Sequence, residues 1–125
     1  MRKLVTLRQI DALSPIPGAD AIEVATIGGW KVVVKKGEFA PGDPCIYFEI
    51  DSFLPDGNPA WQFLVDKQPT EFEGRRGHRL RTARLRGQIS QGFVVPVNAL
   101  PQIVNPREGE DYSEVLGVVK WEQPI

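Results

Sequence analysis

The sequence predicts an all-β domain with small helices at most, and three observations support this fold class. Eleven prolines and twelve glycines among 125 residues indicate many turns. The segments between these turns are short and rich in valine, isoleucine, threonine and aromatic residues, which favour strands. A hydrophobic content of 42% and a charged content of 25% are ordinary for a folded globular chain. We therefore expect one domain, residues 1–125, built as a barrel or a sandwich.

The first third of the chain predicts three strands. Residues 3–10 form the first strand, and the proline-rich stretch 14–18 is predicted to be a rigid loop. Two apolar segments follow, separated by a glycine pair of the kind that closes tight hairpins. These two segments are residues 21–27 and 30–36.

The next predicted strand covers residues 45–51, and its alternating pattern separates two faces. The residues expected to point inward are Ile46, Phe48 and Ile50, and those expected to point outward are Tyr47, Glu49 and Asp51. Residues 52–74 look irregular, apart from a turn and a short helix at 60–65.

The second half of the chain adds two predicted strands, at residues 79–86 and 93–97. A short helix is expected within residues 108–116, and it should end at Gly117. Five or six strands in Greek-key order predict a five-stranded OB-fold barrel. A β-sandwich is the alternative fold.

Residues 79–86 are the most informative stretch because half of them are arginines. The four are Arg79, Arg81, Arg84 and Arg86. Strict alternation would bury two of them, and burying unpaired charge is very costly. We therefore predict a β-bulge near residues 82–83, which turns all four arginines outward and keeps Leu80 and Leu85 in the core.

An outward row of arginines presents forked donors that match phosphate oxygens, and guanidinium groups also stack on the bases of single strands. The alternative is a solvated strand face, or arginines paired with Asp51, Glu71 and Glu73. The lysines of the predicted hairpin either extend this surface or protect a strand edge; they are Lys31, Lys35 and Lys36. Tyr47, predicted to point outward, either stacks on a base or covers the core.

Residues 87–92 have the glycine spacing of a phosphate-binding P-loop, but Phe93 follows where that motif requires lysine. We predict a polar loop between two strands instead. Such a loop either contacts nucleic acid or is a plain tight connection. Its polar side chains are Gln88, Ser90 and Gln91.

No catalytic centre is expected. Cys45 and His78 are the only cysteine and histidine, which excludes a zinc site of the Cys/His type and an internal disulfide. His78 lies among glycines and arginines, and we expect it to be exposed. No acid–base pair or activated nucleophile stands out, so we expect neither a metal nor a cofactor for this chain. No apolar run reaches membrane-spanning length, and the expected location is cytoplasmic, with no membrane partner.

Three blocks of the sequence, in matching order, resemble the N-terminal domain of the Deinococcus-type RNA ligases. They are residues 28–39, 49–55 and 79–92. Residues 116–122 are similar to the segment that leads into the ligase domain of that family, whereas residues 56–76 match least well.

The resemblance implies an OB-fold module that helps to engage a nicked duplex. In this family the module precedes a nucleotidyltransferase domain, which uses ATP and a divalent metal to form a lysyl-adenylate and seals nicks with a 3′-OH RNA end. The catalytic motif Lys-x-Asp-Gly begins at none of the six lysines here. We therefore expect the module without its catalytic domain, either as a piece of a ligase or as a stand-alone version.

The first functional hypothesis is nucleic-acid binding, with RNA or an RNA-containing duplex as the partner. The expected contact residues are Arg79, Arg81, Arg84, Arg86, Lys31, Lys35, Gln88, Ser90, Gln91 and Tyr47. The second hypothesis is a protein-interaction module that docks on a ligase domain or another partner. A weaker similarity of residues 17–22 to the tRNA-binding OB domains of aminoacyl-tRNA synthetases keeps tRNA binding as a further alternative.

Overall fold

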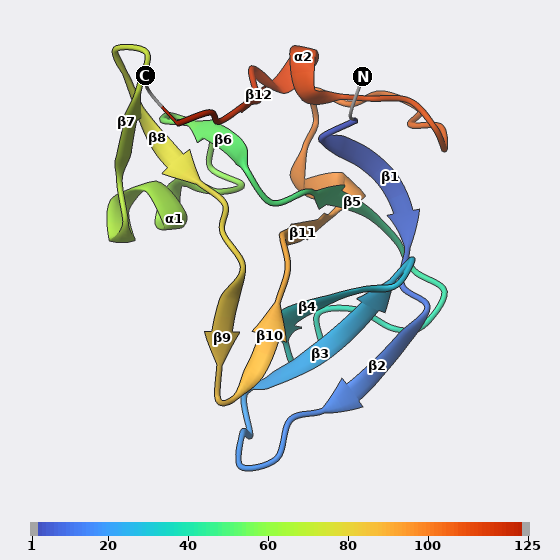
Figure 1. Cartoon of the computed structure of the whole chain (residues 1–125). Helices are drawn as coiled ribbons and strands as arrows, with labels where there is room; N and C mark the ends of the chain where they lie inside the picture. Colours follow the sequence, from blue (N-terminus) through green and yellow to red (C-terminus); the bar gives the residue numbers. More distant parts are fainter. Residues whose placement is uncertain (1–2, 124–125) are drawn as a thin grey trace.

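The computed structural model describes residues 3–123, so the outermost residues of the predicted domain, 1–2 and 124–125, lie outside it. Within the described chain, twelve short strands form four antiparallel sheets, joined by two short α-helices and one 3-10 turn (Figure 1). The fold is mostly β, as predicted.

One sheet joins strands from the beginning, the middle and the second half of the chain. β1 (Val5–Gln9) and β11 (Phe93–Pro96) flank the central strand β5 (Pro44–Phe48). In the register of this sheet, Phe48 lies opposite both Val5 and Phe93. The strands predicted at 3–10 and 93–97 are therefore confirmed, and the strand predicted at 45–51 ends three residues early.

A second sheet has the order β2 (Ala12–Pro15), β3 (Ile22–Ile27) and β4 (Trp30–Lys35). The predicted hairpin is confirmed: Ile27 pairs with Trp30 across the glycine pair, whose φ angles are 51° and 88°. The loop predicted at 14–18 is wrong in its first residues, because β2 extends through Pro15. Proline is tolerated there because β2 lies at the edge of its sheet.

The region predicted to be irregular, residues 52–74, contributes two strands, β6 and β7, to a third sheet with the order β12-β6-β8-β7. Its strands are β6 (Ser52–Pro55), β7 (Thr70–Phe72), β8 (Arg75–Arg79) and β12 (Val119–Lys120). Each has five residues or fewer, which is too short for a clear alternation. Pairing within the sheet, rather than intrinsic propensity, holds them in place.

The two α-helices differ from the predicted ones in position or in length. α1 (Gln62–Lys67) begins two residues after the predicted start, and α2 (Ser113–Leu116) occupies only the end of the predicted segment 108–116. α2 ends at Gly117, whose left-handed conformation, with φ of 71°, confirms the predicted stop.

Two buried clusters meet at β5. Cys45 and Tyr47 belong to the cluster that also contains β3 and β4, whereas Ile46 and Phe48 belong to a cluster that includes Trp61 of the inserted region. Both faces of β5 are therefore covered. The outward orientation predicted for Tyr47 is wrong, since only 1% of this side chain is exposed.

The two remaining strands, β9 (Ala83–Leu85) and β10 (Gln88–Ser90), form a separate hairpin. Hydrogen bonds attach this hairpin to β4: Gln91 N–H donates to the Lys31 carbonyl at 2.7 Å, and Val33 N–H donates to Ser90 Oγ at 3.0 Å. The strands that surround the barrel therefore follow one another in the order β1 and β2, β3, β4, β10, β11 and β5. Strand pairing does not close the barrel completely.

Candidate nucleic-acid interface

The arginine-rich segment, residues 79–86, is divided between two sheets. Arg79 ends β8, residues 80–82 lie outside any strand, and β9 follows. Leu80 is held at the break, where its N–H donates to the Ser52 carbonyl and its own carbonyl accepts from Asp51 N–H. The predicted single strand with a bulge is therefore wrong. Leu80 is buried as expected, but Leu85 is 44% exposed and does not enter the core.

Arg79 is committed to internal contacts. Its Nη2 and Nε donate to Asp51 Oδ1 at 2.9 and 3.1 Å, and its guanidinium lies 3.6 Å from the centroid of the Trp121 ring. For Arg79, the alternative in which an arginine pairs with an acidic residue is therefore correct. Arg79 joins β8 to the segment that follows β12.

The other three arginines are exposed. Arg84 Nη1 donates to the Gly87 carbonyl at 3.3 Å, which spans the turn of the β9–β10 hairpin. Arg86 and Gly87 form that turn, with φ angles of 52° and 82°. Arg81, like Arg86, makes no ion pair within residues 3–123. The guanidinium groups of Arg81 and Arg86 are therefore available to an external anion.

Three of the predicted nucleic-acid contact residues make hydrogen bonds within the protein instead. Tyr47 Oη donates to the Gln91 carbonyl at 2.7 Å, and Gln91 Oε1 accepts from Lys31 N–H at 3.3 Å. Ser90 is buried and accepts from Val33 N–H. Their side chains attach the β9–β10 hairpin to β4 and β5. Gln88, the fourth polar residue, bonds the neighbouring Ile89 carbonyl at 2.9 Å.

The glycine-rich stretch 87–92 is mostly strand and turn, so the predicted polar loop is wrong. Gly87 completes the hairpin turn, and Gly92 lies against β5. A Cβ atom on Gly92 would be 2.4 Å from the Phe48 carbonyl oxygen and 2.8 Å from Tyr47 Oη. The two glycines thus serve a turn and a close backbone approach, not a phosphate loop.

Lys31, Lys35 and Lys36, the lysines of the hairpin, are exposed to solvent. Lys31 Nζ donates to Thr26 Oγ1 at 2.8 Å. Lys35 and Lys36 are exposed and make no ion pair among the described residues.

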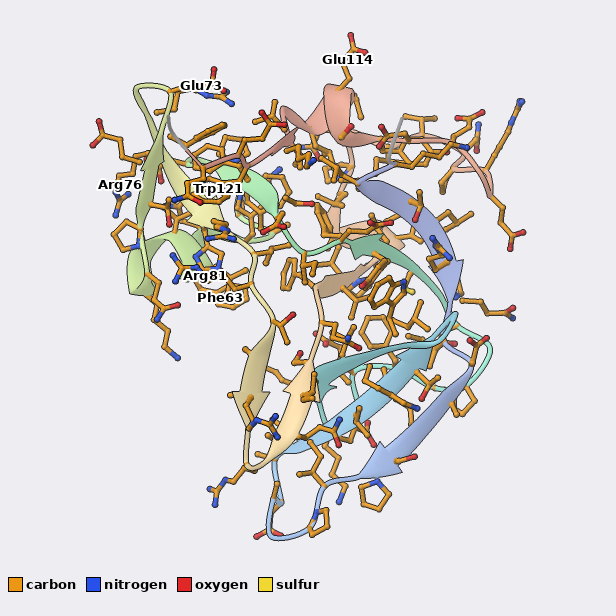
Figure 2. The ribbon with its side chains drawn as sticks, in the orientation of Figure 1. Phe63, Glu73, Arg76, Arg81, Glu114 and Trp121 are labelled. Atoms are coloured by element: carbon orange, nitrogen blue, oxygen red, sulfur yellow. The ribbon has the colours of Figure 1, made fainter. Side chains whose placement is uncertain are left out.

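A cavity of about 630 Å3, here called the α1–β9 cavity, lies beside this surface. It is lined by side chains from α1, β4 and β9 and by the residues that connect β8 to β9. Arg81 and Phe63 both line it, and Figure 2 labels the two side chains on the side of the molecule where α1 lies. Phe63 is 58% exposed. The other charged residues that line the cavity are Lys35, Glu38, Lys67 and Arg79.

The sequence did not single out Phe63 or Lys67. Both lie on α1, within or beside the short helix predicted at 60–65, where an aromatic residue is usually a core residue. Their position at the cavity follows from the packing of α1 near β8, which no local pattern indicates.

The single histidine and the single cysteine of the sequence both lie in the interior of the fold. His78 is buried rather than exposed, and its Nδ1 lies 2.9 Å from the Gln68 carbonyl oxygen. Burial raises the pKa of the Cys45 thiol to about 12, so the reactive thiolate is disfavoured. Among residues 3–123, no group of three His, Cys, Asp or Glu side chains could hold a metal, and no helix is long and apolar enough to cross a membrane.

Comparison with known families defines the class of fold. A family model described as an OB-fold domain matches residues 4–97, which is more than half of the chain. The chain belongs to this family of OB-fold domains. The predicted fold class is therefore confirmed, and the β-sandwich alternative is wrong.

Comparison with solved structures adds a more specific likeness. The chain is 50% identical to the RNA ligase of Naegleria gruberi in its form with pyrophosphate, with a TM-score of 0.94, and the match covers 100% of this chain and 37% of that one. A mutant of the same ligase with ATP and manganese has a TM-score of 0.92 at 50% identity over 98% of this chain and 36% of that one. The chain thus spans little more than a third of the ligase. Comparison with curated protein sequences gave no significant match.

Proposed function

We propose that this chain is the nucleic-acid-binding module of an RNA ligase and that it engages RNA strands or a nicked duplex without sealing them. The observation that carries the proposal is the 50% identity with the Naegleria gruberi RNA ligase over the whole chain. The narrower assignment to the Deinococcus-type ligases stays a prediction, as does the cytoplasmic location. ATP and a divalent metal belong to the remaining part of such a ligase in this proposal.

The position of the arginines supports the proposal. OB-fold barrels bind oligonucleotides on the face of their second and third strands and on the neighbouring loops. Here the corresponding strands are β3 and β4, and their outward residues Ile22, Val33 and Lys35 line the α1–β9 cavity. The arginine-rich segment borders the same cavity.

The proposed phosphate contacts come from Arg81, Arg84 and Arg86, with support from Lys31 and Lys35. Arginine suits this role because its planar fork donates two parallel hydrogen bonds to phosphate. Arg79 is proposed to position the segment through Asp51 and Trp121. Tyr47, Ser90 and Gln91 are left out of the proposed contact set because their side chains serve internal contacts.

The test is fluorescence anisotropy with a nicked RNA–DNA duplex, an intact duplex and a single RNA strand at low and physiological salt. We expect Arg81→Gln and Arg84→Gln each to weaken binding roughly tenfold. Each should also reduce the slope of log affinity against log salt by about 0.7 on a single strand, because one phosphate contact is lost.

The matched control is Arg107→Gln, which removes the same charge from an exposed position that does not line the α1–β9 cavity. It should leave affinity unchanged. Absence of wild-type binding at low salt, or an affinity that does not change with salt, would contradict the proposal.

A second candidate function is docking on the remaining part of a ligase. The specific observation is that exposed apolar side chains, Phe63 and Leu85, line the same cavity as the arginines. Charge reversal by Arg81→Glu and Arg84→Glu would then reduce affinity for that partner and leave nucleic-acid affinity unchanged. The opposite result would favour the first function.

A further inference from the structure

Phe63 exposes an aromatic ring that the fold does not require on the surface. The buried residue of α1 is Val65, whereas Phe63, two residues earlier, is 58% exposed. The Phe63 ring lies 5.9 Å from the Phe93 ring, centroid to centroid, at an interplanar angle of 58°. Phe93 therefore supports one side of the ring, while the rest of the ring stays open to the cavity.

The surroundings of Phe63 combine apolar and positively charged groups. Leu85, which is 44% exposed, lines the same cavity. Lys35, Lys67 and Arg81 also line it, and none of them makes an ion pair within the described part of the chain. Among the residues of the described chain that line the cavity, Glu38 is the only acidic one. An occupant should therefore offer both a flat apolar surface and negative charge.

We propose that the α1–β9 cavity is a subsite for an unpaired nucleobase, which stacks on Phe63 while Arg81 and Lys67 hold its flanking phosphates. This inference rests on the proposed function and deepens it, because it names the ligand as a strand with an unstacked base. Aromatic side chains stack any base, so the subsite is tolerant of sequence. A cavity of about 630 Å3 lies within the range, roughly 300–1,000 Å3, that holds small organic ligands.

Charge complementarity separates this occupant from a protein segment. An apolar peptide would satisfy Phe63 and Leu85 but would leave three cations without a counter-charge. A continuous duplex would satisfy the cations, yet its bases are already stacked on one another. A single strand, or the end of a strand at a nick, satisfies both features.

The test uses a short single-stranded RNA with one 2-aminopurine, whose fluorescence is quenched by stacking. Phe63→Leu removes the ring and keeps an apolar side chain at an exposed position, so folding should be preserved. We expect this variant to bind the strand roughly tenfold more weakly and to abolish the quenching that the wild-type chain causes. Val104→Ala, at an exposed apolar residue that does not line the cavity, is the matched control and should change neither.

A strand with an abasic site in place of the 2-aminopurine separates stacking from other effects. For the wild-type chain, replacing the 2-aminopurine by the abasic site should weaken binding about as much as Phe63→Leu weakens binding to the intact strand. For Phe63→Leu, the abasic site should cause little further loss of affinity. If Phe63→Leu binds more weakly than wild type by the same factor on both strands, base stacking on Phe63 is overturned.

Three further outcomes are distinguishable. Salt-dependent wild-type binding with no effect of Phe63→Leu would overturn the subsite and leave the proposed function standing. Absence of any wild-type binding at low salt would overturn both. Self-association of wild type by sedimentation, lost in Phe63→Leu while strand affinity is unchanged, would assign the cavity to a second copy of the chain and overturn the proposal.

Discussion

Arg86 occupies a backbone conformation that its side chain does not favour. It is the first residue of the two-residue turn between β9 and β10, and its φ is 52°. Such turns prefer asparagine there, because most L residues lose about 1–2 kcal/mol in the left-handed region. A residue that opposes the local conformation is expected where the side chain serves binding rather than folding. Arg86 is therefore the arginine for which folding and the proposed binding make opposite demands.

The substitution Arg86→Asn tests this conflict. We expect it to raise the free energy of unfolding by about 0.5–1 kcal/mol, because asparagine adopts this φ more readily. The same change should weaken nucleic-acid binding, since one guanidinium is lost. Urea unfolding and anisotropy measure the two effects. Arg84→Asn removes an equal charge within β9 and should weaken binding without any gain in stability; a gain of equal size there would contradict the explanation.

At the scale of elements, Gly77 determines how closely β8 approaches β6. A Cβ atom at this position would be 2.4 Å from the Leu54 carbonyl oxygen and 2.5 Å from Phe53 Cζ. Gly77 pairs with Pro55, and Arg79 pairs with Phe53, in the same ladder. The start of the arginine-rich segment therefore depends on a glycine that the sequence alone did not single out.

We predict that Gly77→Ala destabilises the fold by about 1–3 kcal/mol, because the two strands must separate to admit the methyl group. Thermal or urea unfolding measures the change. Gly74→Ala is the comparison, since Gly74 also lies beside β8, but a Cβ atom there would meet no atom within 4 Å and would carry only a conformational cost from the φ of 75°. A Gly77→Ala variant no less stable than Gly74→Ala would show that the close approach is not needed.

The elements that local patterns predicted well are those with enough residues to show alternation or a definite turn. The β3–β4 hairpin is an example, with its glycine pair and two strands of six residues each. The segment around Arg81 could not be predicted because its path depends on distant contacts: Leu80 bonds to Ser52, and Arg79 bonds to Asp51. The same limit applies to Tyr47, whose burial depends on the packing of β3 and β4 against its face of β5.

At the scale of the whole molecule, β5 lies between the two buried clusters, and Cys45 lies on it with 0% of its surface exposed. Burial raises the pKa of this thiol from 9.0 to about 12. The folded chain therefore keeps the thiol proton in a pH range where the unfolded chain has lost it. The contribution of the Cys45 thiol to the free energy of unfolding is fully present below pH 9 and declines as the pH rises toward 12.

We predict that the free energy of unfolding falls between pH 9 and 12 by at most about 1.4 kcal/mol per pH unit from this group. Urea unfolding at a series of pH values measures the slope. Lysines and tyrosines also titrate in this range, so Cys45→Ala is the reference and should show a shallower slope. Parallel slopes in the two proteins would show that the thiol does not carry the effect.

The contact of Arg79 with Trp121 has an optical consequence. The emission of an indole ring depends on the charges beside it, and this guanidinium lies 3.6 Å from the ring centroid. Trp121 therefore reports, without any added label, whether Arg79 stays in place. If a bound strand draws Arg79 away from Asp51, the emission changes; if Arg79 only supports the neighbouring arginines, the strand binds and the emission stays as it was.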